Sequence, residues 1–242
     1  MIDLYYWPTP NGKKVSIMLE ECGLEYKPIQ VNIGRGDQFA LKFLNISPNN
    51  RIPAIVDRGN DIPVFESGAI LLYLAEKAGK FLPQEAAKRM DVLQWLFWQV
   101  GGLGPMAGQL SHFVNYAPEP VPYAHDRYQN EYDRLLGVMN TRLADRDYLA
   151  GEFSIADIAC FPWIAGYKRL GANLDAFTGL RRWFDAIKVR PAVRRGMDLG
   201  DDWRDSSALS DEAARKVLFG QTADSISKAI GKAIARSRQD AQ

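Results

Sequence analysis

Cysteine and histidine are both scarce in this sequence of 242 residues, which has two of each. Cys22 and Cys160 lie far apart, and neither has the CxxC or Cys/His spacing of a zinc site, so we expect no structural metal and no disulfide framework. Neither His112 nor His125 lies beside a recognisable Ser or Cys nucleophile motif, so no catalytic triad is indicated. We therefore interpret both cysteines as packing residues and both histidines as structural.

The sequence also lacks a long hydrophobic run and an excess of charge of one sign. Its longest apolar stretch, residues 69–75, is far shorter than the roughly 20 residues that cross a bilayer, and Asp3 interrupts the N-terminus where a signal-peptide core would stand. Thirty Lys and Arg side chains balance 29 Asp and Glu, so no overall field recruits nucleic acid. We expect a cytoplasmic globular protein that binds neither membranes nor nucleic acid.

The first eighty residues alternate between strand and helix patterns. Pro28 indicates an edge strand, because proline cannot donate to a ladder, and Gly23 and Gly79 stand where helices end. Ser67 is the expected N-cap of the last helix in this region. Strands are expected at residues 2–7, 26–31, 51–57 and 62–65, and helices at residues 15–22, 38–44 and 68–78. The expected order of elements, βαβαββα, predicts a small α/β domain.

Strand patterns disappear after residue 85. We predict an α/β domain at residues 1–80, a linker at 81–85, an all-helical domain at 86–200 and a partly helical extension with a frayed end at 201–242. Ser154 and Asp157 form a capping box, which marks the start of one helix in the second domain. The glycine-rich residues 101–104 follow a helical pattern and lack a Lys-Ser/Thr ending, so we interpret them as a helix break and not as a phosphate loop.

Three short segments are expected to meet at one edge of the predicted sheet: residues 9–12, 52–53 and 66–67. The start of a helix offers free N–H groups and a partial positive charge, so Ser67 could hold a carboxylate there, and Glu66 could pair with an ammonium group. A cis bond before Pro53 would expose the backbone of Ile52 to an extended peptide. In the simpler alternative Ser67 only caps the helix, Glu66 is a solvated acid and Pro53 shapes a bend.

These segments, taken together with the capping box, resemble the glutathione-binding and folding motifs of cytosolic glutathione transferases. The motifs that carry the resemblance are Ile52-Pro53, Glu66-Ser67-Gly68-Ala69-Ile70 and Ser154-Ile155-Ala156-Asp157. A narrower resemblance to the bacterial Nu class lies in PTPNG at residues 8–12, SPNNRIPAIV at 47–56 and LQWLFWQVGG at 93–102. The resemblance implies a thioredoxin-like first domain, an all-helical second domain, a homodimer, and glutathione as co-substrate without a metal.

The same resemblance implies roles for individual residues. The γ-glutamyl head would lie on Glu66 and Ser67, the cysteinyl backbone on Ile52 through a cis Pro53, and another polar end on Gln38. The sulfur would be served by Thr9 and Asn11, with Arg127 reaching across from the partner subunit. Hydrogen bonds from Thr9 and Asn11 would stabilise a thiolate and so lower the pKa of the glutathione thiol.

The absence of a CxxC pair after the first strand decides which mechanism we expect. Residues 9–12 read Thr-Pro-Asn-Gly, so the redox sulfurs would belong to the ligand, and we predict reduction of small or mixed disulfides by two glutathiones. One alternative is conjugation or thioether or aryl-ether cleavage of an aromatic electrophile. Its hydrophobic pocket would be lined by Trp95, Trp98, Phe113 and Tyr167, unless these side chains simply belong to the core. A further alternative is a non-catalytic regulatory protein that binds glutathione.

Overall fold

The structure, a computed structural model, describes residues 1–203 and 212–239. A mixed sheet of four strands forms its first part, in the order β2-β1-β3-β4. The strands are β1 (Ile2–Tyr6), β2 (Tyr26–Gln30), β3 (Ala54–Asp57) and β4 (Ile62–Phe65). β1 runs parallel to β2, β3 is antiparallel to both of its neighbours, and β2, which contains Pro28, lies at an edge as predicted.

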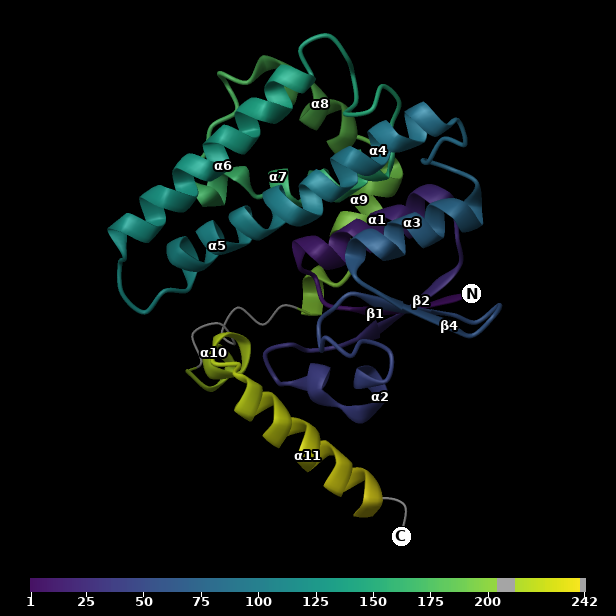
Figure 1. The fold of residues 1–242 in the computed structure, drawn as a ribbon, viewed down its shortest axis with the longest axis vertical. Helices are drawn as coiled ribbons and strands as arrows, with labels where there is room; N and C mark the ends of the chain where they lie inside the picture. Colours follow the sequence, from purple (N-terminus) through teal and green to yellow (C-terminus); the bar gives the residue numbers. More distant parts are fainter. Residues whose placement is uncertain (204–211, 240–242) are drawn as a thin grey trace.

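Helices cover both faces of this sheet. Helices α1 (Pro10–Cys22) and α3 (Ser67–Ala78) lie on one face, and the short helices η1 (Asp37–Phe39) and α2 (Leu41–Leu44) lie on the other (Figure 1). The main hydrophobic core fills the α1 and α3 side and continues into the helical part of the chain, while a smaller cluster of Val31, Phe43 and Ala54 lies on the α2 side. The predicted βαβαββα order is confirmed.

The helical part packs on the far side of α1 and α3, away from the sheet (Figure 1). Its helices are α4 (Ala86–Trp98), α5 (Gly104–Asn115), α6 (Pro122–Arg142), α7 (Ile155–Ile164), η3 (Tyr167–Leu170), α8 (Thr178–Lys188), α9 (Pro191–Asp198) and η4 (Asp201–Trp203). Both α7 and α9 contact α1, which is why α1 is buried on nearly all sides. The limits of the two domains at residues 80 and 86 stay a prediction.

One expected helix break is wrong. Residues 99–103 form a single π-helical turn, η2 (Gln99–Leu103), that joins α4 to α5 without an interruption of the helical path. Such π-helical turns often occur at functional sites, because they change the direction in which side chains project. Here the turn brings Gln99 into the interior, where its side chain is fully buried.

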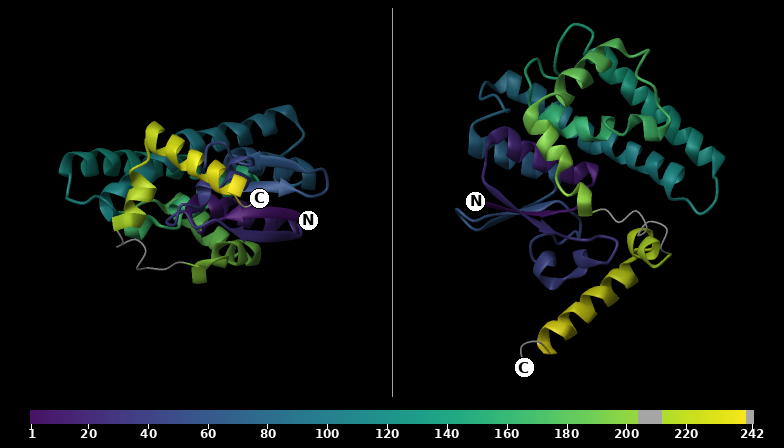
Figure 2. Two further views of the ribbon diagram at one scale, coloured as in Figure 1. Left: turned by 90° about the horizontal axis from the view of Figure 1, so that it is seen from below. Right: turned by 180° about the vertical axis from the view of Figure 1, so that it is seen from behind.

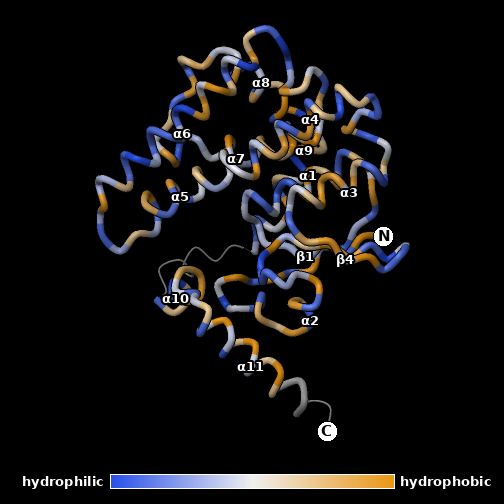
Figure 3. Tube along the Cα trace, in the orientation of Figure 1, coloured by the Kyte–Doolittle hydropathy of each residue, from blue (hydrophilic) through white to orange (hydrophobic). Residues whose placement is uncertain are grey.

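The last part of the described chain forms two helices, α10 (Glu212–Phe219) and α11 (Ala223–Gln239). The Phe219 ring lies 4.7 Å from that of His112, and α11 contacts η1 and α2 on the underside of the sheet (Figures 1 and 2). Apolar residues recur along α11 at Ile226, Ile230 and Ile234. Figure 3 shows hydrophobic and hydrophilic stretches alternating along this helix. The predicted frayed end falls on residues 240–242, outside the described residues.

Candidate functional site

Three turns of the sheet domain meet around a cavity of about 290 Å³. They are the turn between β1 and α1, the loop that leads into β3, and the turn between β4 and α3. The lining residues are Asn11, Ser47, Asn49, Arg51, Ile52, Pro53, Phe65, Glu66 and Ser67. The structure therefore brings together the three segments that the sequence placed at one edge of the sheet.

The first turn contributes the Asn11 side chain to the cavity lining, whereas Thr9, two residues earlier, is not among the lining residues. Thr9 is the N-cap of α1, and its Oγ1 accepts a hydrogen bond of 3.2 Å from the backbone N–H of Gly12, which leaves the hydroxyl hydrogen available for a ligand. Asn11 lines the cavity, and its Oδ1 accepts a 3.1 Å hydrogen bond from Nε1 of Trp163 on α7. A side chain at Gly12 would force the backbone to shift, because a Cβ there would lie 2.4 Å from the carbonyl oxygen of Trp7.

The second segment bends the chain into the sheet. Ser47 Oγ donates a 2.9 Å hydrogen bond to the carbonyl oxygen of Arg51, which closes the loop. The peptide bond between Ile52 and Pro53 is cis, as the resemblance to glutathione transferases implied. Pairing with the neighbouring strands begins at Ala54, so the backbone of Ile52 lies ahead of the ladder and beside the cavity.

The third turn has strained backbone at Glu66. Its φ of 69° and ψ of 117° lie in a region of backbone angles that residues other than glycine rarely adopt. This conformation costs about 1–3 kcal/mol, and residues strained in this way concentrate at functional sites. Asn49 Nδ2 donates a 3.3 Å hydrogen bond to Glu66 Oε1, which orients the carboxylate. The strained turn therefore presents both a carboxylate and the start of α3 to the cavity.

The prediction that Ser67 is the N-cap of this helix is wrong by one residue. Glu66 occupies the cap position, and Ser67 is the first residue of α3. The side chain of Ser67 makes no capping bond and instead accepts a 3.2 Å hydrogen bond from Lys14 Nζ. Its own hydroxyl hydrogen and the free N–H groups of the first turn of α3 are therefore available to an anion.

Lys14 is a site residue that the sequence analysis missed. Its side chain is almost completely buried, and Nζ also donates a 2.6 Å hydrogen bond to Gln99 Oε1. Burial lowers the pKa of the Lys14 ammonium to about 7, against the opposing influence of Cys160 and Glu66. A signal was present, because Lys14 extends the buried stripe of Met18 and Cys22 by one helical turn, but lysine is normally a surface residue.

Two expected site residues lie elsewhere in this subunit. Gln38 does not line the cavity; it is buried, and its Nε2 donates a 3.2 Å hydrogen bond to the carbonyl oxygen of Ile33. Its Oε1 has no hydrogen-bond partner within the described residues. Arg127 lies on the exposed side of α6, 4.0 Å from Glu131, and does not reach the cavity of its own subunit. The roles of Gln38 and Arg127 stay predictions.

The aromatic side chains of the electrophile hypothesis do not gather around one cavity. Trp95 and Trp98 pack edge to face, with ring centroids 5.2 Å apart, against the main core. Phe113 instead stacks on Tyr128, 5.6 Å away on α6, and Tyr167 packs edge-on against Phe184 at 5.8 Å. The expected hydrophobic pocket is therefore not supported.

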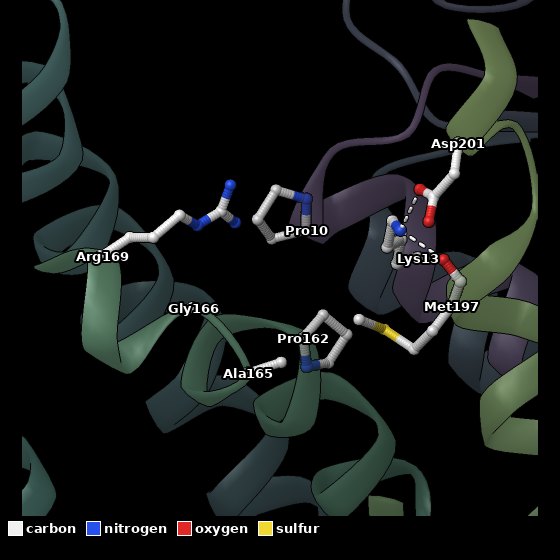
Figure 4. A pocket seen from close by; sticks show the side chains of 8 residues that line it. All are labelled: Pro10, Lys13, Pro162, Ala165, Gly166, Arg169, Met197 and Asp201. Carbon is white, nitrogen blue, oxygen red and sulfur yellow. Dashed lines mark hydrogen bonds and ion pairs between the residues drawn. The ribbon is translucent and has the colours of Figure 1, made fainter. Parts of the chain in front are cut away.

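A second cavity, of about 350 Å³, lies next to the start of α1 (Figure 4). Pro10 lines it, and the guanidinium group of Arg169 points toward Pro10 from the opposite wall. Lys13 also borders this cavity, but its ammonium is bound by the Met197 carbonyl oxygen and by Asp201 at 2.8 Å. Unlike Lys13, Arg169 forms no ion pair with any described residue.

Neither cysteine is placed to act as a nucleophile. Burial raises the pKa of the Cys22 thiol to about 11 and that of the Cys160 thiol well above its usual value, so both stay protonated at neutral pH. In the described part of the chain, no three side chains from His, Cys, Asp and Glu are grouped as metal ligands would be. No helix in that part is both long and apolar enough to span a membrane.

Family models match both parts of the chain. The model of the glutathione S-transferase N-terminal domain matches residues 1–76, and that of the glutathione S-transferase C-terminal domain matches residues 122–186. Among curated proteins, the chain is 52% identical over 215 residues to the disulfide-bond oxidoreductase YfcG of Escherichia coli strain K12, which covers 85% of this chain and 100% of YfcG. It is 44% identical over 212 residues to YghU, a second disulfide-bond oxidoreductase of that strain, and this match covers 81% of this chain and 73% of YghU.

Solved structures show the same likeness. A glutathione transferase from Pseudomonas putida, with one glutathione disulfide bound per subunit, has a TM-score of 0.78 and 46% identity over 82% of this chain and 91% of that one. A glutathione transferase family member from Pseudomonas fluorescens Pf-5, with two glutathione bound, has a TM-score of 0.76 and 46% identity, over 81% of this chain and 92% of that one. These structures contain the ligand class that the cavity lining was expected to hold.

Proposed function

Because the chain belongs to the glutathione S-transferase family, we propose that it reduces small or mixed disulfides with glutathione. One observation carries the proposal: the cavity offers a hydroxyl, an amide, a carboxylate and a helix start, but no protein thiol. A site of this kind suits a peptide that brings its own sulfur. The names of two close relatives as disulfide-bond oxidoreductases support the same reaction.

The γ-glutamyl head of glutathione would lie at the start of α3. Its carboxylate accepts hydrogen bonds from the Ser67 hydroxyl and from the free N–H groups of the first helical turn, where the helix dipole favours negative charge. Its ammonium group pairs with Glu66, which Asn49 holds in place. The cysteinyl backbone lies along Ile52, and Gln38 would serve another polar end of the tripeptide.

The cysteinyl sulfur would then lie at the start of α1. Asn11 can donate from Nδ2, because its Oδ1 is already bound by Trp163, and Thr9 can donate from its hydroxyl. Hydrogen bonds to the thiolate lower the pKa of the thiol from its usual value of about 8.5. More of the bound glutathione is then in the thiolate form, which is the nucleophile.

The reaction consists of two thiol–disulfide exchanges. The bound thiolate attacks one sulfur of the disulfide, so that a new S–S bond to glutathione forms while the old S–S bond breaks and the other half leaves as a thiolate. A second glutathione thiolate attacks the glutathione sulfur of the mixed disulfide and releases glutathione disulfide and the second thiol. In total, two glutathiones are oxidised and one disulfide is reduced to two thiols, with protons returned to the leaving thiolates.

Reduction of hydroxyethyl disulfide by glutathione tests this function directly. We expect turnover above the uncatalysed rate in the wild type, and a rate about 10-fold to 100-fold lower in Asn11→Ala with glutathione affinity changed by only a small factor. Asn60→Ala, at an exposed turn between β3 and β4, is the matched control and keeps the wild-type rate. Conjugation of an aromatic electrophile without disulfide reduction would contradict the proposal, as would glutathione binding without any turnover.

A homodimer with shared sites is part of the proposal, as is a cytoplasmic location. Phe97 and Met90 on α4 and Phe65 at the end of β4 are exposed apolar side chains of the kind that a subunit interface covers. Arg127 of the partner subunit would then complete the sulfur site. Mixing Asn11→Ala subunits with Arg127→Ala subunits checks this: heterodimers have one intact site and regain activity if the arginine acts across the interface. If Arg127→Ala homodimers are inactive and heterodimers form without recovery, Arg127 does not act across the interface.

A further inference from the structure

Lys14 is a buried cation whose hydrogen-bond partners are both neutral. Its side chain is 2% exposed, and its ammonium contacts Ser67 Oγ at 3.2 Å and Gln99 Oε1 at 2.6 Å. No carboxylate among the described residues forms an ion pair with it, whereas the adjacent Lys13 pairs with Asp201 at 2.8 Å. A buried charge that lacks a counter-ion is costly, because little solvent remains to stabilise it.

Within the described part of the protein, Glu66 is the one charged carboxylate among the groups that act on Lys14, and it forms no ion pair with it. The titratable groups that face it are Cys160 on α7 and Glu66 at the start of α3. The Cys160 thiol is neutral, because burial raises its pKa, and the Glu66 carboxylate is directed to Asn49. The π-helical turn contributes only the neutral Gln99, and α9 approaches α1 through Gly196, which carries no side chain.

Ser67 connects this buried ammonium to the cavity. Ser67 Oγ accepts from Lys14 Nζ on its interior side, while the residue itself lines the cavity on the other side. A serine hydroxyl can accept one hydrogen bond and donate another at the same time. An anion that accepts a hydrogen bond from Ser67 would therefore be linked to the buried ammonium through one hydroxyl group.

We propose that Lys14 is the counter-ion of the glutathione carboxylate held at Ser67, and that the protein takes up a proton at Lys14 Nζ when glutathione binds. This inference rests on the proposed function, since it takes the carboxylate to lie at Ser67. In the free protein, burial leaves the pKa of Lys14 at about 7, so a large part of the population is uncharged just above neutral pH. A carboxylate beside Ser67 favours the charged form and raises that pKa.

Proton uptake makes affinity depend on pH in a defined direction. Well below pH 7 the ammonium is already charged, so binding takes up almost no proton there. Above pH 7 each binding event must also protonate Lys14, and affinity falls by up to about tenfold per pH unit until the raised pKa of the complex is passed. Glutathione itself obscures this effect, because its thiol releases a proton when it binds as a thiolate.

S-methylglutathione removes that complication, since its sulfur cannot ionise. Titration calorimetry of the full-length protein at about pH 8, in buffers with different ionisation enthalpies, gives the number of protons taken up per ligand bound. For the wild type we expect uptake of about half a proton or more, and for Lys14→Met we expect close to none. Lys88→Met, an exposed lysine on α4, is the matched control and keeps the uptake of the wild type. A proton taken up by the amino group of the ligand beside Glu66 is still taken up in Lys14→Met, so the difference between the two proteins isolates Lys14.

The affinities give a second readout. Lys14→Met is expected to bind S-methylglutathione about 10-fold to 100-fold more weakly than the wild type at pH 6.5, and the difference narrows toward pH 9. Lys14→Gln replaces Lys14→Met if that variant does not fold. Binding by the wild type without proton uptake, or equal uptake in the Lys14 variant, overturns the inference and leaves the disulfide reductase proposal intact. Failure of the wild type to bind either ligand overturns both.

Discussion

The indole Nε1 of Trp163 donates a 3.1 Å hydrogen bond to Oδ1 of Asn11, across the contact between α7 and α1. Because an indole N–H can only donate, it fixes the amide oxygen on its own side and leaves the Asn11 Nδ2 group to donate elsewhere. Two glycines of α5 make room for the indole: a Cβ at either Gly104 or Gly108 would lie 3.4 Å from it. The helical domain therefore sets the orientation of a side chain in the sheet domain.

Replacing Trp163 tests this positioning role. Phe keeps most of the ring volume but has no N–H, so the Asn11 amide is free to turn its oxygen toward the thiolate. We expect Trp163→Phe to lower kcat for disulfide reduction by about 3-fold to 10-fold, to raise the pKa of the bound thiol, and to leave glutathione affinity nearly unchanged. The pH–rate profile and the ultraviolet absorbance of the thiolate measure the two effects. Trp98→Phe, which alters an aromatic pair on α4, is the control. An unshifted pH–rate profile in Trp163→Phe would mean that Asn11 is held by other contacts.

The buried lysine also makes a prediction about stability. The pKa of Lys14 is about 7 in the folded protein and about 10.4 in an unfolded chain, so the unfolded state binds more protons between these two values. Without ligand, the free energy of unfolding of the wild type should therefore rise from pH 7 to pH 10. Below pH 7 the full cost of burying the charged Lys14 is present, so the protein is least stabilised there with respect to this group.

Lys14→Met should remove this pH dependence. At pH 6 we expect the variant to be more stable than the wild type by about 1–4 kcal/mol, and near pH 10 the difference should be small. Urea denaturation at pH 6, 8 and 10 measures it, with the exposed Lys88→Met as control. A Lys14→Met protein that loses stability equally at all three pH values would show that packing and hydrogen bonds of Lys14 outweigh the cost of burying its charge.

Asp157 stabilises the start of α7 and joins three segments of the helical domain. It is fully buried and accepts hydrogen bonds from the N–H of Leu149 (3.0 Å), from the N–H and hydroxyl of Ser154 (3.0 and 3.1 Å), and from Nε1 of Trp183 (2.8 Å).

Asp157→Ala leaves these buried donors without an acceptor, so we expect the free energy of unfolding to fall by about 3 kcal/mol or more. Ser154→Ala removes the hydrogen bond that Oγ accepts from the N–H of Ala156 and the one it donates to Asp157, and should cost about 1 kcal/mol. Denaturation midpoints compare the two, and equal losses would show that the Leu149 and Trp183 bonds contribute little.

Much of the fold follows from local sequence signals. The glycine at 23 ends a helix, the proline at 28 marks an edge strand, and residues 154–157 form a capping box, each because of the chemistry of one or a few neighbouring residues. The meeting of the three turns also follows, because a βαβ unit and a hairpin place their connections at the same edge.

The site features that the sequence does not predict depend on contacts between distant segments. Lys14 looks like a surface residue until α7 and α9 cover the outer side of α1, and nothing local marks that burial. The bond between Trp163 and Asn11 joins residues 152 positions apart. The glycines at residues 101–104 predict a helix break because glycine often ends helices, but the structure continues through them in the π-helical turn at residues 99–103, and Gly104 packs closely against Gln99.

The packing of α9 against α1 depends on a single glycine. A Cβ at Gly196 would lie 2.6 Å from both the backbone N and the Cα of Ile17, and these backbone atoms cannot move without displacing α1. The contact is reinforced by Ser16, whose Oγ donates a 2.6 Å hydrogen bond to the carbonyl oxygen of Gly196. Because α1 carries Asn11 at its start and Lys14 one turn later, displacement of this helix would also disturb the candidate site.

Gly196→Ala should therefore destabilise the protein, although alanine has the higher helix propensity. We expect a loss of about 1–3 kcal/mol together with weaker glutathione binding. Gly137→Ala on α6 is the matched control: no heavy atom lies within 4 Å of the added Cβ, so this variant should gain about 0.5–1 kcal/mol from helix propensity alone. Thermal denaturation and glutathione titration of the two variants separate the effects. If Gly196→Ala behaved like Gly137→Ala, α9 would be free to shift away from α1, and the close approach of the two helices would not constrain the site.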